Sequence, residues 1–215
     1  MHSPQNPPSN TAVKVAVVYY SATGSVRALA AAAAEAAEAD GAQVRLRKVQ
    51  ELAPAHAIAS NQQWSDHHAA TAHINEATVD DLDWADVILL GSPTRFGLPA
   101  AQLKQFLDLT GGLWARGGLI DKVCSAFTST GTVHGGQEST ILAIANTFYH
   151  WGAIIVPPGY ADSAQYTIGN PYGTSHVSDN GRVPPGDAEL AAIAFQTRRA
   201  IRIARSLHRT TSTDH

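Results

Sequence analysis

A short apolar run, followed by a hydroxyl-rich turn and an alanine-rich segment, constrains this chain more than any other feature. Residues 15–20 are apolar and mostly β-branched or aromatic, which predicts a fully buried strand. Residues 21–25 have the sequence Ser-Ala-Thr-Gly-Ser, and residues 26–39 have the composition of a helix. Such a turn presents backbone N–H groups, hydroxyl donors and the positive end of a helix dipole, and these together bind anions.

The turn suits a single phosphate monoester better than a triphosphate or a pyrophosphate. It lacks the Gly-Lys-Ser/Thr of a P-loop and the Gly-x-Gly-x-x-Gly of a dinucleotide-binding turn. Gly24 allows the backbone to approach a phosphate closely, because no Cβ stands in the way. Helix N-caps favour the same residue types, so an ordinary capped helix is the alternative interpretation of this turn.

The composition indicates a globular protein with a lightly charged surface. The length of 215 residues is enough for one α/β domain with a sizeable core. Of these residues, 44% are hydrophobic and 15% are charged. The formal net charge of −3 argues against nucleic-acid binding and against an anionic membrane surface, and it is small for a dedicated electron carrier.

Two further features concern the compartment. The single cysteine, Cys124, lies in an apolar run, so we expect a buried thiol in a protein of the reducing cytoplasm. No run approaches the ~18 consecutive apolar residues of a membrane span, and none is expected.

Five predicted strands alternate with helices, which indicates a parallel sheet covered on both faces. The predicted strands are residues 15–20, 43–49, 86–91, 122–128 and 153–156, and the predicted helices are 26–39, 100–109, 137–150 and 187–207. Residues 54–79 and 157–185 show no periodicity and are predicted to be long loop excursions. A single domain over 13–208 is expected between a disordered tail at 1–12 and a C-terminal tail at 209–215.

Four histidines lie in the first of these excursions, but no metal site is expected there. Their spacing matches no zinc pattern, and no cysteine is near them.

Three loops, at 21–26, 92–99 and 129–136, follow the first, third and fourth predicted strands. In parallel sheets of this kind, ligands bind at the carboxyl ends of the strands. We therefore expect the three loops to converge on one site, which favours a functional interpretation of the first loop.

With these loops in place, the chain resembles the flavodoxin-like superfamily and, within it, the WrbA family of FMN-dependent NAD(P)H:quinone oxidoreductases. The motifs that carry the resemblance are Tyr19-Tyr-Ser-Ala-Thr-Gly-Ser25, Gly91-Ser-Pro-Thr-Arg-Phe-Gly97, Phe106-Leu-Asp-Leu-Thr-Gly-Gly-Leu-Trp114, Ser129-Thr-Gly-Thr132 with Gly135-Gly-Gln-Glu138, and Asn170-Pro-Tyr-Gly173. The resemblance covers about residues 14–207. It implies a doubly wound, five-stranded parallel sheet, bound FMN, NADH or NADPH as electron donor, a quinone as acceptor, and a homotetramer.

The resemblance also implies roles for individual residues. The FMN phosphate is expected to be held by Ser21, Ala22, Thr23, Gly24, Ser25 and Val26. The isoalloxazine ring is expected to be bordered by Thr94, Arg95, Phe96 and Gly97 and by Ser129, Thr130, Gly131, Thr132, Val133 and His134. Trp114 is expected to wall the substrate pocket and His150 to reach a flavin, both across a subunit interface.

Each of three residues also has a purely structural interpretation. Phe96 is alternatively a core residue, and Trp114 alternatively packs beneath residues 157–185. His150 is alternatively a helix C-terminal residue favoured by the helix dipole alone.

Two departures from the family pattern affect the site. Val26 stands where short-chain flavodoxins carry a threonine, so one hydroxyl contact to the phosphate is missing. Thr23 stands where some members have a tyrosine beside the nicotinamide pocket, which leaves the choice between NADH and NADPH open.

No catalytic side chain is predicted, because the cofactor carries the hydride chemistry. Arg95 and His150 are both candidates to stabilise the charge of a reduced flavin. A serine hydrolase built on Ser129, Thr130 and His134 is disfavoured, since the chain lacks the Gly-x-Ser-x-Gly turn at this point. The alternative function is a flavodoxin-like carrier that passes single electrons to a protein partner.

Overall fold

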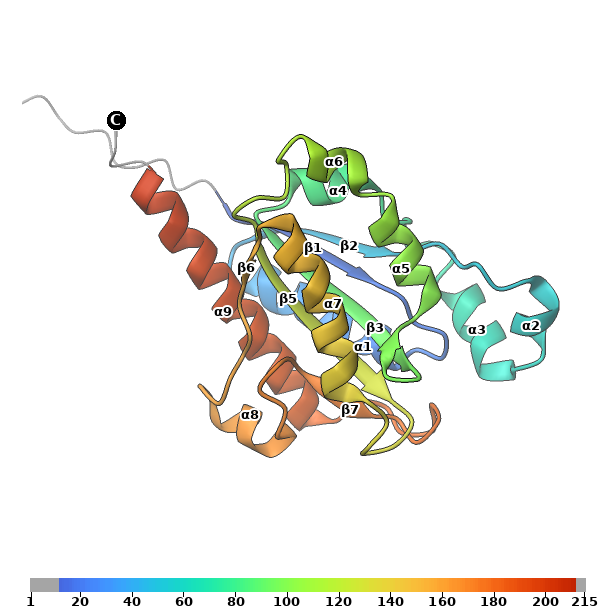
Figure 1. The fold of residues 1–215 in the computed structure, drawn as a ribbon. Helices are drawn as coiled ribbons and strands as arrows, with labels where there is room; N and C mark the ends of the chain where they lie inside the picture. Colours follow the sequence, from blue (N-terminus) through green and yellow to red (C-terminus); the bar gives the residue numbers. More distant parts are fainter. Residues whose placement is uncertain (1–11, 212–215) are drawn as a thin grey trace, which may run out of the picture.

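Five parallel strands form the centre of the fold in a computed structural model that describes residues 12–211 (Figure 1). They are β1 (Lys14–Tyr19), β2 (Gln43–Lys48), β3 (Val87–Arg95), β5 (Val123–Thr130) and β6 (Ile154–Ile155). Their spatial order is β2-β1-β3-β5-β6, so the order reverses between β1 and β3. The predicted five-stranded parallel sheet is confirmed, and its switch point lies beside the hydroxyl-rich turn.

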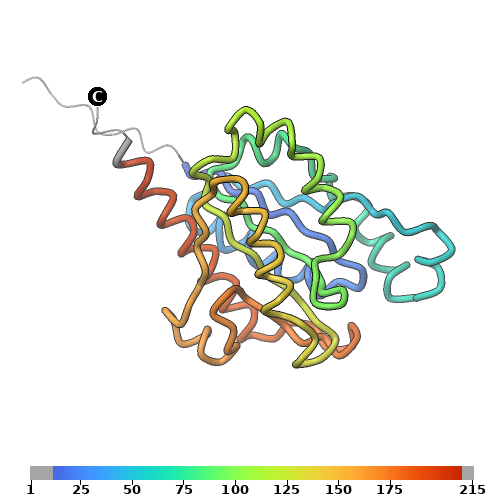
Figure 2. The backbone as a smooth tube through the Cα atoms, in the orientation of Figure 1, coloured from blue at the N-terminus to red at the C-terminus, as the bar shows by residue number. Residues whose placement is uncertain are grey.

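Helices cover both faces of the sheet, as the ribbon and the tube show (Figures 1 and 2). One face carries α1 (Ser25–Ala39) and α9 (Asp187–Thr211), and the other carries α4 (Val79–Trp84), α5 (Ala101–Asp108), α6 (Gly111–Ala115) and α7 (Gln137–Trp151). Alternate residues of each strand point to opposite faces. Val17 therefore shares a core with Leu29 of α1, whereas Val18 shares the other core with Phe148 of α7. Cys124 is fully buried in this second core, as predicted.

The first predicted loop excursion contains two helices, α2 (Ala55–Ala59) and α3 (Gln62–Ala70), so its description as an irregular loop was wrong. Neither helix buries a residue, which explains why no apolar periodicity marks them. The signal that starts α3 is local: the Asn61 side chain accepts a hydrogen bond from the Trp64 amide at 3.2 Å.

The second excursion is also partly regular, with α8 (Ser163–Ile168) and β7 (Ser175–Val177). β7 pairs in parallel with the end of β5. A distant residue positions it, because the Gln196 side chain on α9 accepts a hydrogen bond from the Thr174 amide at 2.7 Å. The sequence of residues 157–185 therefore contains no local pattern from which the contact with Gln196 could be predicted.

Two boundaries differ from the prediction. β3 continues to Arg95 and pairs with a short antiparallel strand, β4 (Leu98–Pro99), where a loop from Ser92 was expected. α9 ends at Thr211 and so extends into the predicted C-terminal tail. Most of both predicted tails, residues 1–11 and 212–215, lies outside the described residues.

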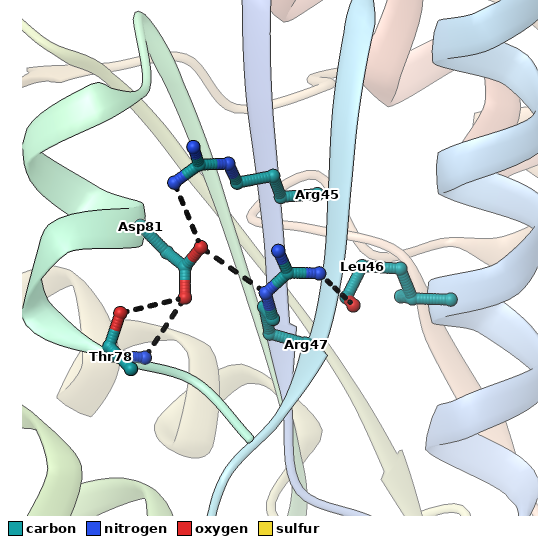
Figure 3. A network of polar contacts seen from close by, with 5 residues as sticks. All are labelled: Arg45, Leu46, Arg47, Thr78 and Asp81. Atoms are coloured by element: carbon teal, nitrogen blue, oxygen red, sulfur yellow. Dashed lines mark hydrogen bonds and ion pairs between the residues drawn. The ribbon is translucent and has the colours of Figure 1, made fainter. Parts of the chain in front are cut away.

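A buried carboxylate fixes α4 and the preceding segment against β2 (Figure 3). Asp81 is 4% exposed and forms ion pairs with Arg45 at 3.1 Å and Arg47 at 3.2 Å. Its other oxygen accepts hydrogen bonds from the amide and hydroxyl of Thr78, completing a capping box at the start of α4. One side chain thus joins the end of the α2–α3 excursion to the sheet.

Candidate functional site

The turn between β1 and α1 has the geometry of an anion-binding loop. Gly24 precedes the first residue of α1 with φ at +104°, a conformation that L side chains rarely adopt. The Ser21 hydroxyl accepts a hydrogen bond from the Gly24 amide at 3.1 Å, which fixes the turn. Because the N-cap is a glycine, it offers no side chain to the first N–H groups of α1, and these can serve a ligand.

A cavity of about 260 Å³ lies in front of this turn. Segments from all three predicted loops line it, so their expected convergence is confirmed. The predicted site residues that line the cavity are Ser21, Ala22, Thr23, Ser25, Val26, Thr94, Arg95, Ser129, Thr130 and Gly131. Five further lining residues were not predicted, namely Asn61, Pro93, Ser178, Asn180 and Gly181.

The second and third loops pack directly against each other. The Thr94 hydroxyl donates to the Gly135 carbonyl at 3.2 Å and receives a hydrogen bond from the Thr140 hydroxyl at 2.8 Å. A Cβ on Gly136 would lie 2.7 Å from the Cα of Gly97, so only glycine permits this contact. The pairing makes one continuous wall from two loops.

The rim of this wall carries a fully exposed aromatic residue. Phe96 is 104% exposed relative to its reference, so the alternative that it belongs to the core is wrong. Its φ of +55° is unusual for a bulky residue and is maintained only where the surrounding structure requires it. Arg95 beside it donates to the Thr94 carbonyl at 2.9 Å and lines the cavity, while Val133 and His134 are exposed on the third loop.

Ser129 has a buried partner that sequence reasoning missed. Its hydroxyl lies 3.0 Å from Nδ1 of His176 in β7, and both residues are less than 5% exposed. Burial lowers the pKa of His176, against smaller opposing effects of the Glu189 charge and the Pro184 carbonyl. The pair is therefore neutral, and it joins β7 to the end of β5.

Glu51 organises the side of the site next to α3. Its carboxylate accepts hydrogen bonds from the Tyr20 hydroxyl at 2.8 Å, the Trp64 indole at 3.1 Å and the Gln102 amide at 2.7 Å. Burial opposes ionisation of Glu51, but these bonds and one from the Ala53 amide outweigh burial and lower its pKa. Burial and the Glu51 charge raise the pKa of Tyr20. The carboxylate thus ties α3 to the end of β1 and to α5.

His67 of α3 stands next to the anion-binding turn. Its Nδ1 lies 3.5 Å from the position that a Cβ on Gly24 would occupy. Burial lowers its pKa to about 4, and the nearby charges of Arg27, Lys48 and His68 add to the effect. Arg27 and Lys48 thus place positive charge near His67, which itself stands beside the turn, and this charge suits an anion.

Trp114 and His150 are brought to each other and not to the cavity. His150 lies in the last turn of α7, which ends at the amino ends of the strands. There the amide of Asp121, just before β5, donates a hydrogen bond to the carbonyl of Gly152, just after α7, at 3.1 Å. The cavity lies at the carboxyl ends, about 20 Å away along α7. Trp114 is 54% exposed, so the alternative that it is packed beneath residues 157–185 is wrong.

Within residues 12–211, no cluster of three or more His, Cys, Asp or Glu side chains is arranged to hold a metal ion. Over the same part of the chain, every helix is too short or too polar to span a membrane.

Comparison with known proteins agrees with this geometry. The family model described as NADPH-dependent FMN reductase matches residues 13–167. A Deinococcus radiodurans protein named NAD(P)H dehydrogenase (quinone) is 45% identical over 196 residues, covering 91% of this chain and 97% of its own. A protein of the same name from Geotalea daltonii is 44% identical, covering 91% and 98%.

Solved structures give the same fold. A WrbA-like flavodoxin from Agrobacterium tumefaciens superimposes with a TM-score of 0.64 at 22% identity, covering 91% of this chain and 99% of its own. An archaeal flavodoxin gives a TM-score of 0.56 at 19% identity, covering 91% and 99%. The chain therefore belongs to the NADPH-dependent FMN reductase family and is, as its motifs predict, a flavodoxin-like FMN-dependent oxidoreductase.

Proposed function

We propose that the protein is an NAD(P)H:quinone oxidoreductase that binds FMN in the cavity and takes its two substrates in turn. The observation that carries the proposal is the convergence of the three loops, from β1, β3 and β5, on a single cavity. The proteins with 45% and 44% identity are named for the same reaction, which supports the proposal.

The residues of the cavity fit FMN by the chemistry of their donors. The hydroxyls of Ser21, Thr23 and Ser25 and the uncapped N–H groups after Gly24 would hold the phosphate. Arg95 would supply positive charge beside the ring, and the wall made by the second and third loops would supply backbone donors and hydroxyls. When bound, FMN accepts a hydride from the nicotinamide and passes two electrons to the quinone.

The similar shape of the two substrates favours their alternation over a ternary complex. A nicotinamide ring and a quinone ring are both flat and similar in size, so each can stack in the same space. Phe96, exposed on the rim, offers an aromatic surface that suits either ring. The two substrates would then exclude each other, which gives a ping-pong cycle.

The alternative is an electron carrier that presents a flavin edge to a protein partner. Asn61, the N-cap of α3, and Ser178, Asn180 and Gly181 line the cavity, however, and would cover part of such an edge. The small net charge also gives little basis for an acidic docking face. These observations favour the enzyme.

A second copy of the chain would complete the site. Trp114 and His150 lie at the opposite edge of the sheet from the cavity of their own chain, so they could reach a flavin only in another subunit. We propose a homotetramer of paired subunits, since closed two-fold assemblies are the common solution for shared sites. The buried, unpaired thiol of Cys124 fits a cytoplasmic location.

Steady-state kinetics and anaerobic reduction test the proposal. Rates with benzoquinone, varied against NADH and NADPH, should give parallel double-reciprocal lines. Anaerobic mixing with a nicotinamide nucleotide should bleach the bound flavin within the turnover time. Reduction by a reductase protein in one-electron steps, with no response to either nucleotide, would instead establish the carrier.

A further inference from the structure

Residues 178–181 form an unusual turn. Asp179, Asn180 and Gly181 have φ values of +46°, +55° and +87°, so three successive residues adopt the left-handed conformation and two of them are not glycine. Such residues persist only where other contacts hold them, and they gather at ligand clamps. Here the Gly181 amide donates to the Ser178 hydroxyl at 3.2 Å, and Arg182 pairs with Asp179.

The base of the turn is fixed to the third loop. Both the amide and the hydroxyl of Ser178 donate to the Thr130 carbonyl, at 2.8 Å and 3.0 Å. The Asn180 side chain lies against Gly131, because a Cβ on Gly131 would lie 2.8 Å from the Asn180 Oδ1. The turn therefore starts from the end of β5.

The tip of the turn reaches the phosphate loop and α3. A Cβ on Gly181 would lie 2.9 Å from the Thr23 hydroxyl oxygen and 3.0 Å from Oε1 of Gln63. The Gln63 amide also approaches the Gly181 carbonyl at 3.5 Å, although the two residues are 118 positions apart. The turn thus crosses the cavity, from the loop after β5 to the loop after β1.

We propose that residues 178–181 and Gln63 form a phosphate clasp that selects FMN over FAD and retards release of the flavin. The clasp rests on the proposed FMN site, and it concerns chain segments that carry none of the family motifs. A phosphate monoester ends at the Ser21–Val26 loop and needs no further room. The second phosphate and the adenosine of FAD would need an outlet beside Thr23, where Gly181 and Gln63 are in contact.

Substitution of Gly181 by alanine tests the clasp. The added Cβ would lie only 2.9 Å from the Thr23 hydroxyl oxygen, at a φ of +87° that L side chains rarely adopt, so we expect the tip to shift away from the phosphate loop. Relative to wild type, we expect release of FMN to be about tenfold faster and the ratio of the FAD and FMN dissociation constants to fall about tenfold. Gly41→Ala is the matched control, because Gly41 has φ at +79° but no atom within 4 Å of its Cβ position.

A second pair of variants tests the contact from α3. Gln63→Ala should release FMN about two- to threefold faster, because it removes only one weak contact. Gln62→Ala on the same helix is the control, since the Gln62 side chain donates a hydrogen bond to Asp66 within α3. The release rate is measured by recovery of flavin fluorescence, and the dissociation constants are measured by its quenching. Circular dichroism verifies that each variant is folded.

Two outcomes distinguish the clasp from the function on which it rests. In the first outcome, the wild-type protein binds FMN, and both Gly181→Ala and Gln63→Ala release FMN and discriminate against FAD as the wild type does. This result would overturn the clasp alone. Wild-type protein that binds neither flavin would overturn the proposed function and the clasp together.

Discussion

The indole N–H of Trp114 donates a hydrogen bond to the carbonyl oxygen of His150 at 2.7 Å. The family resemblance implies that Trp114 walls a substrate pocket and that His150 reaches a flavin, yet the two are joined at the amino edge of the sheet, away from the cavity of their own chain. Since the acceptor is a backbone oxygen, the bond does not depend on the imidazole. The roles of the two side chains can therefore be separated by mutation.

His150→Ala should leave stability within about 0.5 kcal/mol, because the imidazole is exposed and the Trp114 bond is kept. If His150 reaches a flavin in an adjoining subunit, kcat/KM for the quinone should fall about tenfold, which is ~1.4 kcal/mol. Trp114→Phe should instead lose about 1 kcal/mol of stability, because the His150 carbonyl loses its donor. Thermal unfolding and steady-state kinetics give the two readouts. Unchanged kinetics in His150→Ala would remove this residue from the site.

The assembly itself can be tested directly. FMN-loaded protein at micromolar concentration should sediment as a tetramer, because each cavity lacks Trp114 and His150 from its own chain. A monomer that is fully active under the same conditions would contradict a site shared between subunits.

Gly24→Val should weaken FMN binding at least about tenfold, or ~1.4 kcal/mol. Valine rarely adopts φ near +104°, and its side chain would also extend toward His67, whose ring already lies 3.5 Å from the Cβ position. Titration of flavin fluorescence measures the change. The control is Gly41→Val, which carries the same side chain at a similar φ in open space. Identical titration curves for Gly24→Val and wild type would remove this loop from the phosphate site.

His67 makes the stability of the flavin-free protein depend on pH. Burial lowers its pKa to about 4 in the folded state, against an ordinary value of 6.5. Between these values the unfolded chain binds more protons than the folded one, so stability falls as the pH is lowered from 6.5 to 4. We expect a lower Tm at pH 5 than at pH 7 and a smaller difference in His67→Gln.

The same residue should respond to the ligand. A phosphate bound beside His67 favours the protonated imidazole, so FMN should reduce the pH dependence of the wild-type Tm. His56→Gln, at an exposed position on α2 and not among the charges that shift the His67 pKa, is the control and should behave as wild type. The assignment fails if His67→Gln and wild type show the same pH profile with and without FMN.

Asp81→Ala should destabilise the fold by about 3 kcal/mol, since it leaves Arg45 and Arg47 without their buried partner and removes the capping box of α4. Urea unfolding should show a lower midpoint with an unchanged slope. Asp80→Ala lies in the same first turn but is exposed, and it should cost less than 1 kcal/mol, roughly the loss of a dipole contact. Equal midpoints for the two variants would contradict the role of Asp81.

The sequence by itself determined the sheet and the hydroxyl-rich turn after β1. Strands such as residues 15–20 and helices such as 137–150 carry dense local patterns, because each buries an apolar face that repeats at the period of its own secondary structure. The hydroxyl-rich turn is likewise local, since Ser21, Gly24 and the helix start lie within five residues. Such features need no knowledge of distant parts of the chain.

The tertiary structure decided what surrounds that site. α3 buries no residue, and residues 178–181 lie far along the chain. Gln63 of α3 nevertheless approaches Gly181, 118 positions away, and Gly181 in turn lies beside Thr23. His176 joins Ser129 only because β7 pairs with β5, and Trp114 joins His150 only because α7 runs back along the sheet. Contacts between segments distant in sequence leave no periodic signal in either segment, so only the folded chain shows which segments lie around the cavity and which lie away from it.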